Sequence, residues 1–272
     1  MTVSTEPERV ALVTGAARGI GAAVVDRLVA RGHVVYAVDL GGDGTAATHE
    51  LASDAYPLAT QEDLEGLTGR HGPAVVPLAA DVRNPQAISG VVDRIRGERG
   101  RLDVVVAGAA VIAGGDAQWE TDDALLDAVW RADAVSVWNT AKATVPMLLE
   151  QPAEQRPVFV AIGSVAGLHG LYHLSAYVMA KHAVIGLVRA LAADVAGSPV
   201  TVCCVCPGST DTAMLTETAR IYDLPHTEDL VAEQAIGRSL TPDEVAAVVE
   251  LACFAGPAVH GAVLPASGGF RL

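Results

Sequence analysis

Residues 10–39 read VALVTGAARGIGAAVVDRLVARGHVVYAVD, and this stretch decides the fold of the 272-residue chain. An apolar run at 10–14 predicts a strand, and after a glycine-rich turn the stretch 19–31 predicts a helix. A second apolar run at 33–38 predicts another strand, which ends at Asp39. In such a unit the glycines let the backbone approach a pyrophosphate, whose charge meets the free N–H groups at the helix N-terminus. The stretch therefore predicts a dinucleotide-binding unit.

The carboxylate of Asp39 indicates which dinucleotide this unit takes. It follows the glycines by about 20 residues, the distance at which an acid accepts the adenosine ribose hydroxyls. A negative charge there repels the extra phosphate of NADP, so we expect NAD. The three residues between Gly15 and Gly19 differ from the commoner GxGxxG spacing. A tight turn beside a surface aspartate therefore remains the alternative.

Tyr177 and Lys181 lie four residues apart in the string AYVMAKHAV, thirteen residues after Ser164. Residues four apart on a helix share a face, so the phenol and the ammonium can meet. The positive charge favours the phenolate and lowers the pKa of the tyrosine. A tyrosine tuned in this way takes a proton from an alcohol or returns one to a carbonyl. Such pairs also occur by chance, so this one gains its weight from the dinucleotide unit.

The composition limits the classes of protein to consider. A chain with 51% hydrophobic and 18% charged residues can bury one sizeable α/β core. The net charge of −14 argues against nucleic acid or an anionic membrane as a partner. No apolar run is expected to reach membrane-spanning length, and residues 1–9 lack the basic start and apolar stretch of a signal peptide. We therefore expect a cytoplasmic protein.

The four cysteines predict buried side chains and no metal site. Alternation along a strand sends Cys204 and Cys206 to one face and Cys203 to the other. Cys253 stands alone in a predicted helix, and no second pair with zinc spacing accompanies the three. Oxidation of Cys206, beside the predicted cofactor site, is the open alternative.

The alternation of strands and helices predicts a single domain over residues 1–272. Its architecture is a Rossmann-type, doubly wound parallel α/β sheet of about seven strands with helices on both faces, whose ligand lies across the carboxyl ends of the strands. The strands are expected at 10–14, 33–38, 74–79, 103–107, 157–163, 199–205 and 261–265, and the helices at 19–31, 85–98, 121–149, 175–196 and 242–254.

Together these motifs resemble the short-chain dehydrogenase/reductase family from about Arg9 to Gly269. The resemblance implies an NAD-dependent enzyme that moves a hydride between an alcohol and the cofactor. It implies that Ser164 holds the substrate oxygen, that Tyr177 transfers the proton, and that Lys181 assists Tyr177 and binds the nicotinamide ribose. The positions that it implies for cofactor binding are Gly15, Ala17, Arg18, Gly19, Ile20, Asp39, Leu40, Asp81, Val82, Ala107, Gly108, Ala109, Tyr177, Lys181, Pro207, Gly208, Thr210 and Thr212.

The chain departs from the family pattern at two places. Ala107 replaces an asparagine that ties neighbouring strands together, so we expect some loss of stability but not of binding. Asp133 replaces the fourth catalytic residue, an asparagine whose backbone carbonyl supports a proton-relaying water in the family. Its charge is expected to keep Lys181 protonated and to cancel part of the effect of Lys181 on Tyr177. Asn139 is the alternative candidate for the fourth catalytic position, although its helical register is unfavourable.

Residues 40–73 are longer than a simple crossover requires, and a polar surface loop is one explanation. The string YPLATQEDL at 56–64 resembles the insertion of the mycofactocin-associated dehydrogenases, a group that includes carveol-dehydrogenase-like proteins. That resemblance implies an insertion beside the cofactor, NAD that does not exchange, and mycofactocin as the external electron acceptor.

Residues 213–237 predict an amphipathic substrate lid that excludes water, with ordinary surface helices as the alternative. An apolar lid suits an apolar or terpenoid-like secondary alcohol. Its apolar residues are Met214, Leu215, Ile221, Tyr222, Leu224, Leu230 and Ile236, and further pocket candidates are Trp119, His169 and His173.

Two alternatives to this function stay open: a freely exchanging NAD(H)-dependent carbonyl reductase, and a catalytically weak NAD-binding protein. The family resemblance also implies a homotetramer that assembles through the helices at 121–149 and 175–196.

Overall fold

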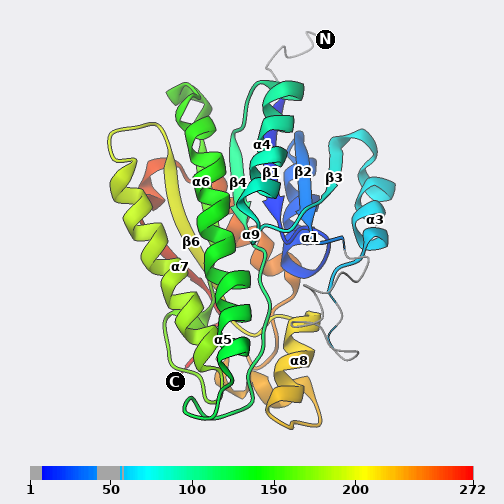
Figure 1. Ribbon diagram of the computed structural model, residues 1–272, viewed down its shortest axis with the longest axis vertical. Coiled ribbons are helices and arrows are strands. Elements are labelled where there is room, and N and C mark those ends of the chain that lie inside the picture. Colours follow the sequence, from blue (N-terminus) through cyan, green and yellow to red (C-terminus); the bar gives the residue numbers. More distant parts are fainter. Residues whose placement is uncertain (1–7, 42–55, 57, 272) are drawn as a thin grey trace.

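A seven-stranded parallel sheet runs through the centre of the molecule, in the order β3-β2-β1-β4-β5-β6-β7 (Figure 1). The structure is a computed structural model, and it describes residues 8–41, 56 and 58–271. The strand order reverses between β1 and β4, and at such a switch point the loops after the strands diverge and leave room for a ligand. The predicted doubly wound parallel sheet is confirmed.

All seven predicted strands are present, with ends that differ from the predicted ones by no more than two residues. They are β1 (Arg9–Thr14), β2 (His33–Asp39), β3 (Val75–Ala79), β4 (Val104–Ala107), β5 (Val158–Ile162), β6 (Thr201–Pro207) and β7 (Val263–Ala266). The helices are α1 (Gly19–Ala30), α3 (Gln61–His71), α4 (Pro85–Arg99), α5 (Asp123–Trp130), α6 (Ser136–Leu149), α7 (Ser175–Asp194), α8 (Ala213–Ile221) and α9 (Pro242–Phe254).

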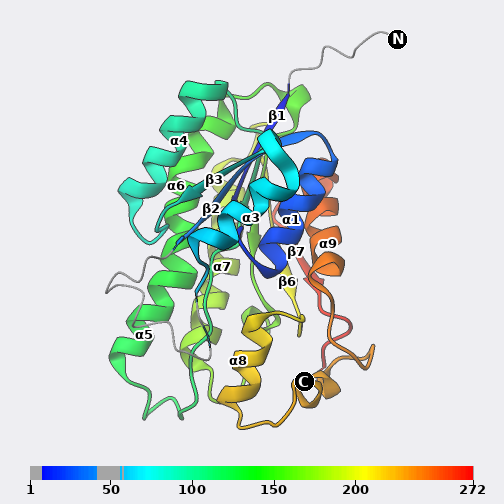
Figure 2. The same ribbon diagram turned by 90° about the vertical axis from the view of Figure 1, so that its right-hand side faces the viewer.

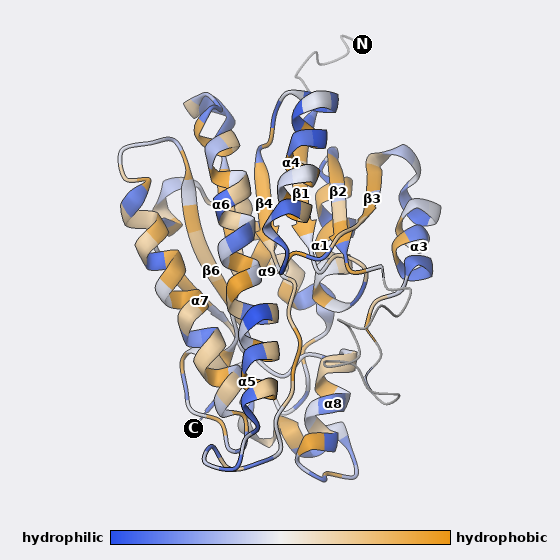
Figure 3. Ribbon diagram, in the orientation of Figure 1, coloured by the Kyte–Doolittle hydropathy of each residue, from blue (hydrophilic) through white to orange (hydrophobic). Residues whose placement is uncertain are grey.

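Helices cover both faces of the sheet (Figure 2). The core on one face joins the sheet to α4, α6 and α7, and the core on the other joins it to α1, α3 and α9. The colours of Figure 3 show that the strands carry mainly hydrophobic residues, as expected for a sheet that is buried on both faces. Cys204 and Cys206 belong to the first core and Cys203 to the second, as predicted from strand alternation, and all four cysteines are free and buried.

The first and last helices of the sheet pack against each other. Arg27 of α1 forms ion pairs with Asp243 at 2.8 Å and with Glu250 at 2.7 Å, both on α9. Val24, on the same helix, and Val245, on α9, belong to the same core. Residues more than 200 positions apart in the sequence therefore close one face of the sheet.

Helix α3 was not predicted. Thr60 begins it with a capping box, in which its side chain accepts from the backbone N–H of Asp63 and the Asp63 carboxylate accepts from the backbone N–H of Thr60. Leu64 and Leu67 bury its inner face. Residues 42–55 and 57 of the predicted insertion lie outside the described residues, but Tyr56 is buried.

The predicted helix at 121–149 is divided. A π-helical turn over Arg131–Val135 separates α5 from α6. Such a turn inserts an extra residue into the helical repeat and shifts the faces on either side of it. The division matters because Asp133 lies within the turn.

Helix α7 corrects an expectation from the sequence. It has the length and mean hydropathy that a membrane span needs, although no such run was expected. It packs against β6 and contributes Val184, Ile185 and Val188 to the core. Its apolar character is that of a core helix.

Candidate active site

A cavity of about 520 Å³ opens at the carboxyl ends of the strands. It is lined by most of the residues that the sequence singles out, from elements far apart in the chain. These lining residues are Gly15, Arg18, Gly19, Ile20, Asp39, Leu40, Asp81, Val82, Gly108, Ala109, Ser164, Tyr177, Lys181, Pro207, Gly208, Thr210 and Thr212. Ala17, Ala107 and Asp133 lie behind this lining, because all three are buried and none reaches the cavity.

Ser164, Tyr177 and Lys181 converge on this cavity, as predicted. Ser164 follows β5, and its Oγ accepts a hydrogen bond of 3.1 Å from the backbone N–H of Ala166. Tyr177 and Lys181 lie one turn apart on α7, and the Lys181 Nζ is 5.5 Å from the centre of the Tyr177 ring. The three side chains are therefore held on rigid supports around one point.

Asp133 contacts Lys181 directly through its side chain. The Lys181 Nζ lies 3.1 Å from the Asp133 Oδ2, and neither side chain is more than 3% exposed. The other oxygen, Oδ1, accepts a hydrogen bond of 2.8 Å from the backbone N–H of Val111, which lines the cavity. The sequence placed the charge of Asp133 near Lys181, and the structure shows that the two side chains form a direct, buried ion pair.

The pKa of Tyr177 is raised above its ordinary value, whereas the sequence predicted that it would be lowered. Burial is the main cause of the rise, the charge of Lys181 opposes it, and the charge of Asp133 adds to it. Burial acts to lower the pKa of Lys181, but the charge and hydrogen bond of Asp133 oppose it, and the pKa is raised above its ordinary value. This direction agrees with the expectation that Asp133 keeps Lys181 protonated.

The glycine-rich turn brings two backbone segments too close for side chains. A Cβ on Gly21 would lie 1.9 Å from the Gly15 carbonyl oxygen, and one on Gly15 would lie 2.8 Å from the Cα of Ala109. Helix α1 begins after Arg18 without a side-chain cap, whereas α3 and α9 have capping boxes. A helix N-terminus left open toward a cavity fits the pyrophosphate of a dinucleotide.

Asp39 is fixed by the backbone on both of its oxygens. Its Oδ2 accepts from the Ala17 N–H at 2.9 Å and its Oδ1 from the Leu40 N–H at 2.8 Å. Burial raises the pKa of Asp39, and the two hydrogen bonds oppose the rise. The carboxylate therefore lies beside the glycine-rich turn, where the predicted ribose would bind.

Thr14 supplies a link for which the sequence offered no candidate. Its Oγ1 accepts hydrogen bonds from the backbone N–H groups of Gly108 at 3.1 Å and Ala109 at 3.4 Å. Ala107 therefore does not leave the segment after β4 disconnected from β1.

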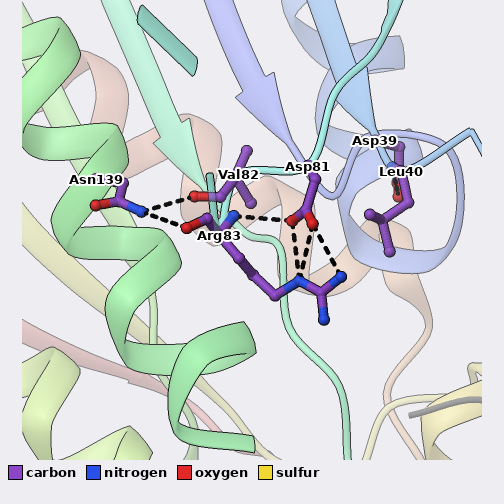
Figure 4. Close-up of polar contacts among 6 residues, drawn as sticks. All are labelled: Asp39, Leu40, Asp81, Val82, Arg83 and Asn139. Atoms are coloured by element: carbon purple, nitrogen blue, oxygen red, sulfur yellow. Dashed lines mark hydrogen bonds and ion pairs between the residues drawn. The ribbon is translucent and has the colours of Figure 1, made fainter. Parts of the chain in front are cut away.

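The loop after β3 carries polar contacts that the sequence did not predict (Figure 4). The Arg83 side chain binds the Asp81 carboxylate, with Nε 2.9 Å from Oδ1 and Nη2 2.9 Å from Oδ2. Asn139 points to this loop, and its Nδ2 donates to the carbonyl oxygens of Val82 at 3.1 Å and Arg83 at 3.0 Å. Asn139 is therefore not the substitute for the fourth catalytic residue, in agreement with its unfavourable register.

The predicted lid begins with α8 and faces the cavity with part of its apolar side. Met214, Leu215, Tyr222 and Leu230 line the cavity, whereas Ile236 is exposed. The Tyr177 hydroxyl lies 3.8 Å from the Met214 Sδ, so the lid reaches the candidate catalytic tyrosine. The Tyr222 hydroxyl donates to the Tyr172 carbonyl oxygen at 2.8 Å and joins the lid to the loop before α7.

Three other predicted pocket residues lie elsewhere. Trp119 is 81% exposed, His169 lies against Phe270, and His173 stacks on Tyr172. None of the three lines the cavity. Residues that line it and were missed include Tyr56, Val111, Ile112, Leu171, Tyr172, Leu174 and Phe270. Tyr56 lies in the string at 56–64 that the resemblance places beside the cofactor, and the others carry no local sequence signal.

Comparisons with known proteins agree with this geometry. The sequence profile described as short chain dehydrogenase matches residues 9–222. The chain is 34% identical to an uncharacterized oxidoreductase of Mycobacterium tuberculosis, over 96% of each protein. It is also 34% identical to (-)-trans-carveol dehydrogenase of Rhodococcus erythropolis, over 76% of this chain and 73% of that protein. The crystal structure of carveol dehydrogenase from Mycobacterium avium in complex with NAD is similar, with a TM-score of 0.87, 28% identity and coverage of 97% of both chains.

Proposed function

The chain belongs to the short-chain dehydrogenase family, and from that membership we propose that it interconverts an apolar, terpenoid-like secondary alcohol and its ketone with NAD. The observation that carries the proposal is the convergence of Ser164, Tyr177 and Lys181 on the cavity that the glycine-rich turn also borders. A proton-transfer group and a site for a hydride acceptor must share one cavity for this reaction.

In the proposed reaction each polar side chain has one task. Ser164 donates a hydrogen bond to the substrate oxygen, and Tyr177, as the phenolate, takes the proton of the alcohol and becomes the neutral phenol. Lys181, held by Asp133, keeps a positive charge beside Tyr177 and binds the nicotinamide ribose. NAD, when bound, supplies the acceptor for the hydride.

The choice of NAD over NADP is supported by Asp39. Its carboxylate lies beside the turn that begins α1, fixed by the Ala17 and Leu40 N–H groups. A phosphate on the ribose would bring like charges together at a partly desolvated position, where repulsion is strong.

The apolar substrate class is supported by an apolar part of the wall of the cavity. This wall combines lid residues with residues from the loops after β4 and before α7. It consists mainly of Val111, Ile112, Leu171, Leu174, Met214, Leu215, Tyr222 and Leu230. Such a surface favours the burial of a hydrocarbon skeleton, and it would strip a charged acid of its water without offering a counter-charge.

We also propose that NAD stays bound through turnover and that mycofactocin reoxidises it. The similarity to the carveol dehydrogenases and the sequence at 56–64 support this part of the proposal. The described part of the insertion adds a buried Tyr56 to the cavity lining, and burial raises the pKa of this phenol and keeps it neutral. A neutral aromatic wall beside the cofactor site would slow the departure of a bound nucleotide.

A second candidate function has one observation in its favour. The ion pair between Asp133 and Lys181 offsets the charge that would activate Tyr177, and this favours a catalytically weak NAD-binding protein. A freely exchanging carbonyl reductase is the other alternative, and rapid cofactor exchange would favour it.

The proposed assembly is a homotetramer in the cytoplasm. Exposed apolar side chains on α6 and α7 support a protein interface there, namely Trp138, Leu149 and Met179.

The test is to purify the protein without added nucleotide, mix it with carveol and record the near-ultraviolet absorbance of NADH. We expect one stoichiometric band, with turnover only after an artificial dye acceptor is added. Steady turnover that needs free NAD would support the exchanging enzyme instead, and NAD binding without any band would support the weak NAD-binding protein.

Two tyrosine variants give this test its control. Tyr177→Phe should lower the rate by about 100-fold or more, since the proton acceptor is lost. Tyr36→Phe removes a hydroxyl that donates to Glu98 at 2.6 Å, outside the cavity, and should leave the rate unchanged. Undiminished turnover by Tyr177→Phe would contradict the proposed mechanism.

A further inference from the structure

The loop between β3 and α4 borders the cavity with Ala80, Asp81, Val82 and Arg83. Its backbone is anchored at its start, where the Ala80 N–H donates to the Asp39 carbonyl oxygen at 2.8 Å. Asp39 and Asp81 therefore lie at the same end of the cavity (Figure 4). This is the end at which the adenosine half of NAD would bind under the proposed function.

Asn139 fixes the middle of this loop from another element. It projects from α6 and is only 6% exposed, and it does not line the cavity itself. Its Nδ2 donates to the carbonyl oxygens of Val82 at 3.1 Å and Arg83 at 3.0 Å, across 57 and 56 positions of sequence. An amide nitrogen has two hydrogens, so one side chain can satisfy two successive carbonyls.

The Asp81 carboxylate is oriented within the same loop. Its Oδ1 accepts from the backbone N–H and the Nε of Arg83, both at 2.9 Å, and its Oδ2 lies 2.9 Å from Nη2. A two-pronged pairing of guanidinium and carboxylate fixes the plane of both groups. The position of this pair then depends on the backbone that Asn139 holds.

We infer that Asn139 is a positioning residue for the adenine half of the nucleotide, acting through the backbone of Val82 and Arg83. The inference rests on the proposed use of NAD. Without the Asn139 amide, two carbonyls at the edge of the core lose their donor, and the backbone between them is free to shift. Such a shift would move the Val82 side chain and the Asp81–Arg83 pair, but not Ser164, Tyr177 or Pro207.

The test measures binding rather than turnover, with two ligands that represent the two halves of NAD. Protein freed of resident nucleotide by charcoal is titrated with ADP-ribose, which carries adenine, and with nicotinamide mononucleotide, which does not. Asn139→Leu removes both donors at similar volume. We expect its Kd for ADP-ribose to rise about tenfold, equivalent to about 1.4 kcal/mol, and its Kd for nicotinamide mononucleotide to stay within about twofold.

Thr144→Val is the matched control. Thr144 is fully buried on the same helix, and its Oγ1 donates to the Thr140 carbonyl oxygen within α6, so its loss weakens the helix without touching the loop. It should leave both affinities unchanged. Asn139→Ser keeps one hydroxyl donor and should give an intermediate Kd for ADP-ribose. If Asn139→Leu does not fold, Asn139→Ser takes its place in the test.

Three outcomes would overturn the inference. The first is an unchanged Kd for ADP-ribose in Asn139→Leu and Asn139→Ser, with the unaltered protein binding normally. The second is an equal loss of affinity for both ligands, which indicates general loosening. The third is a failure of the unaltered protein to bind ADP-ribose at all, which would overturn the proposed use of NAD as well.

Discussion

The Lys181 ammonium and the Asp133 carboxylate form a buried ion pair, with Nζ 3.1 Å from Oδ2. Asp133 also accepts from the Val111 N–H, so the same carboxylate joins α7 to the loop that lines the cavity after β4. Removing one partner of such a pair leaves an uncompensated charge. The pair therefore fixes the position of Lys181 while it weakens the field that Lys181 exerts on Tyr177.

We predict that Asp133→Asn shifts the pH profile of alcohol oxidation toward lower pH by about one unit. The charge of Asp133 raises the pKa of Tyr177, so its removal lowers that pKa and populates the phenolate at lower pH. The measurement is kcat against pH at saturating substrate. Ser136→Ala, a buried neutral position nearby on α6, is the control and should keep the profile in place. A shift toward higher pH would contradict the proposed role of the charge.

Met214 should control the size of the alcohol that the cavity accepts. Its Sδ lies 3.8 Å from the Tyr177 hydroxyl, so the side chain occupies space next to the reacting oxygen. Met214→Ala should shift the preference in kcat/KM toward bulkier secondary alcohols by about tenfold. The measurement is kcat/KM for alcohols of increasing size. Met179→Ala, at an exposed site on α7, should leave the preference unchanged, and an unchanged preference in Met214→Ala would disprove the assignment.

Gly21→Ala should abolish tight nucleotide binding, because the added Cβ would lie 1.9 Å from the Gly15 carbonyl oxygen. The turn must move to relieve the overlap, and we expect the Kd for ADP-ribose to rise by at least about tenfold. Gly90→Ala is the control, since its Cβ would meet nothing within 4 Å inside α4. It should raise the free energy of unfolding by about 0.5–1 kcal/mol and leave binding intact. A normal Kd for ADP-ribose in Gly21→Ala would contradict the requirement for a glycine beside the Gly15 carbonyl oxygen.

His33 should make the protein sensitive to mild acid. It is buried beside Phe254, and burial is the main cause that lowers its pKa. The folded state therefore favours the neutral ring. The contribution of the neutral His33 ring to the free energy of unfolding is fully present above the ordinary histidine pKa of about 6.5. It falls as the pH drops below that value, by up to about 1.4 kcal/mol per pH unit.

The measurement is urea unfolding at pH 7 and pH 5.5. His33→Phe should lose less free energy of unfolding between the two values than the unaltered protein does. Replacement of the exposed His226 by Gln should make no difference. Equal losses in His33→Phe and the unaltered protein would show that His33 does not titrate with unfolding.

The parts of the site that local rules govern could be predicted from the sequence. The glycine-rich turn, the acid at the end of β2 and the spacing of Tyr177 and Lys181 each follow from a strand end or from one helical turn. Because parallel strands end at the same edge of the sheet, residues after β1, β4, β5 and β6 meet there without further information.

Other features depend on contacts that sequence spacing does not encode. The Asn139 amide meets the Val82 carbonyl across 57 positions, and nothing near either residue indicates the pairing. The direct contact of Asp133 with Lys181 arises in a π-helical turn, which an uninterrupted α-helical repeat does not predict. The pKa of Tyr177 was misjudged because burial, which outweighs the charge of Lys181, becomes visible only in the folded structure.

The packing of α1 against α9 has a consequence for biosynthesis. Arg27, on the helix whose N-terminus faces the cavity, pairs with Asp243 and Glu250. The N-terminal part of the chain leaves the ribosome first. Helix α1 therefore cannot pack against α9 until nearly the whole polypeptide has been synthesised. Pairing of β1 with β4 adds another distant closure, and distant closures slow folding. The helix that begins the nucleotide site is thus synthesised first, but its packing against α9 can form only after most of the chain has been made.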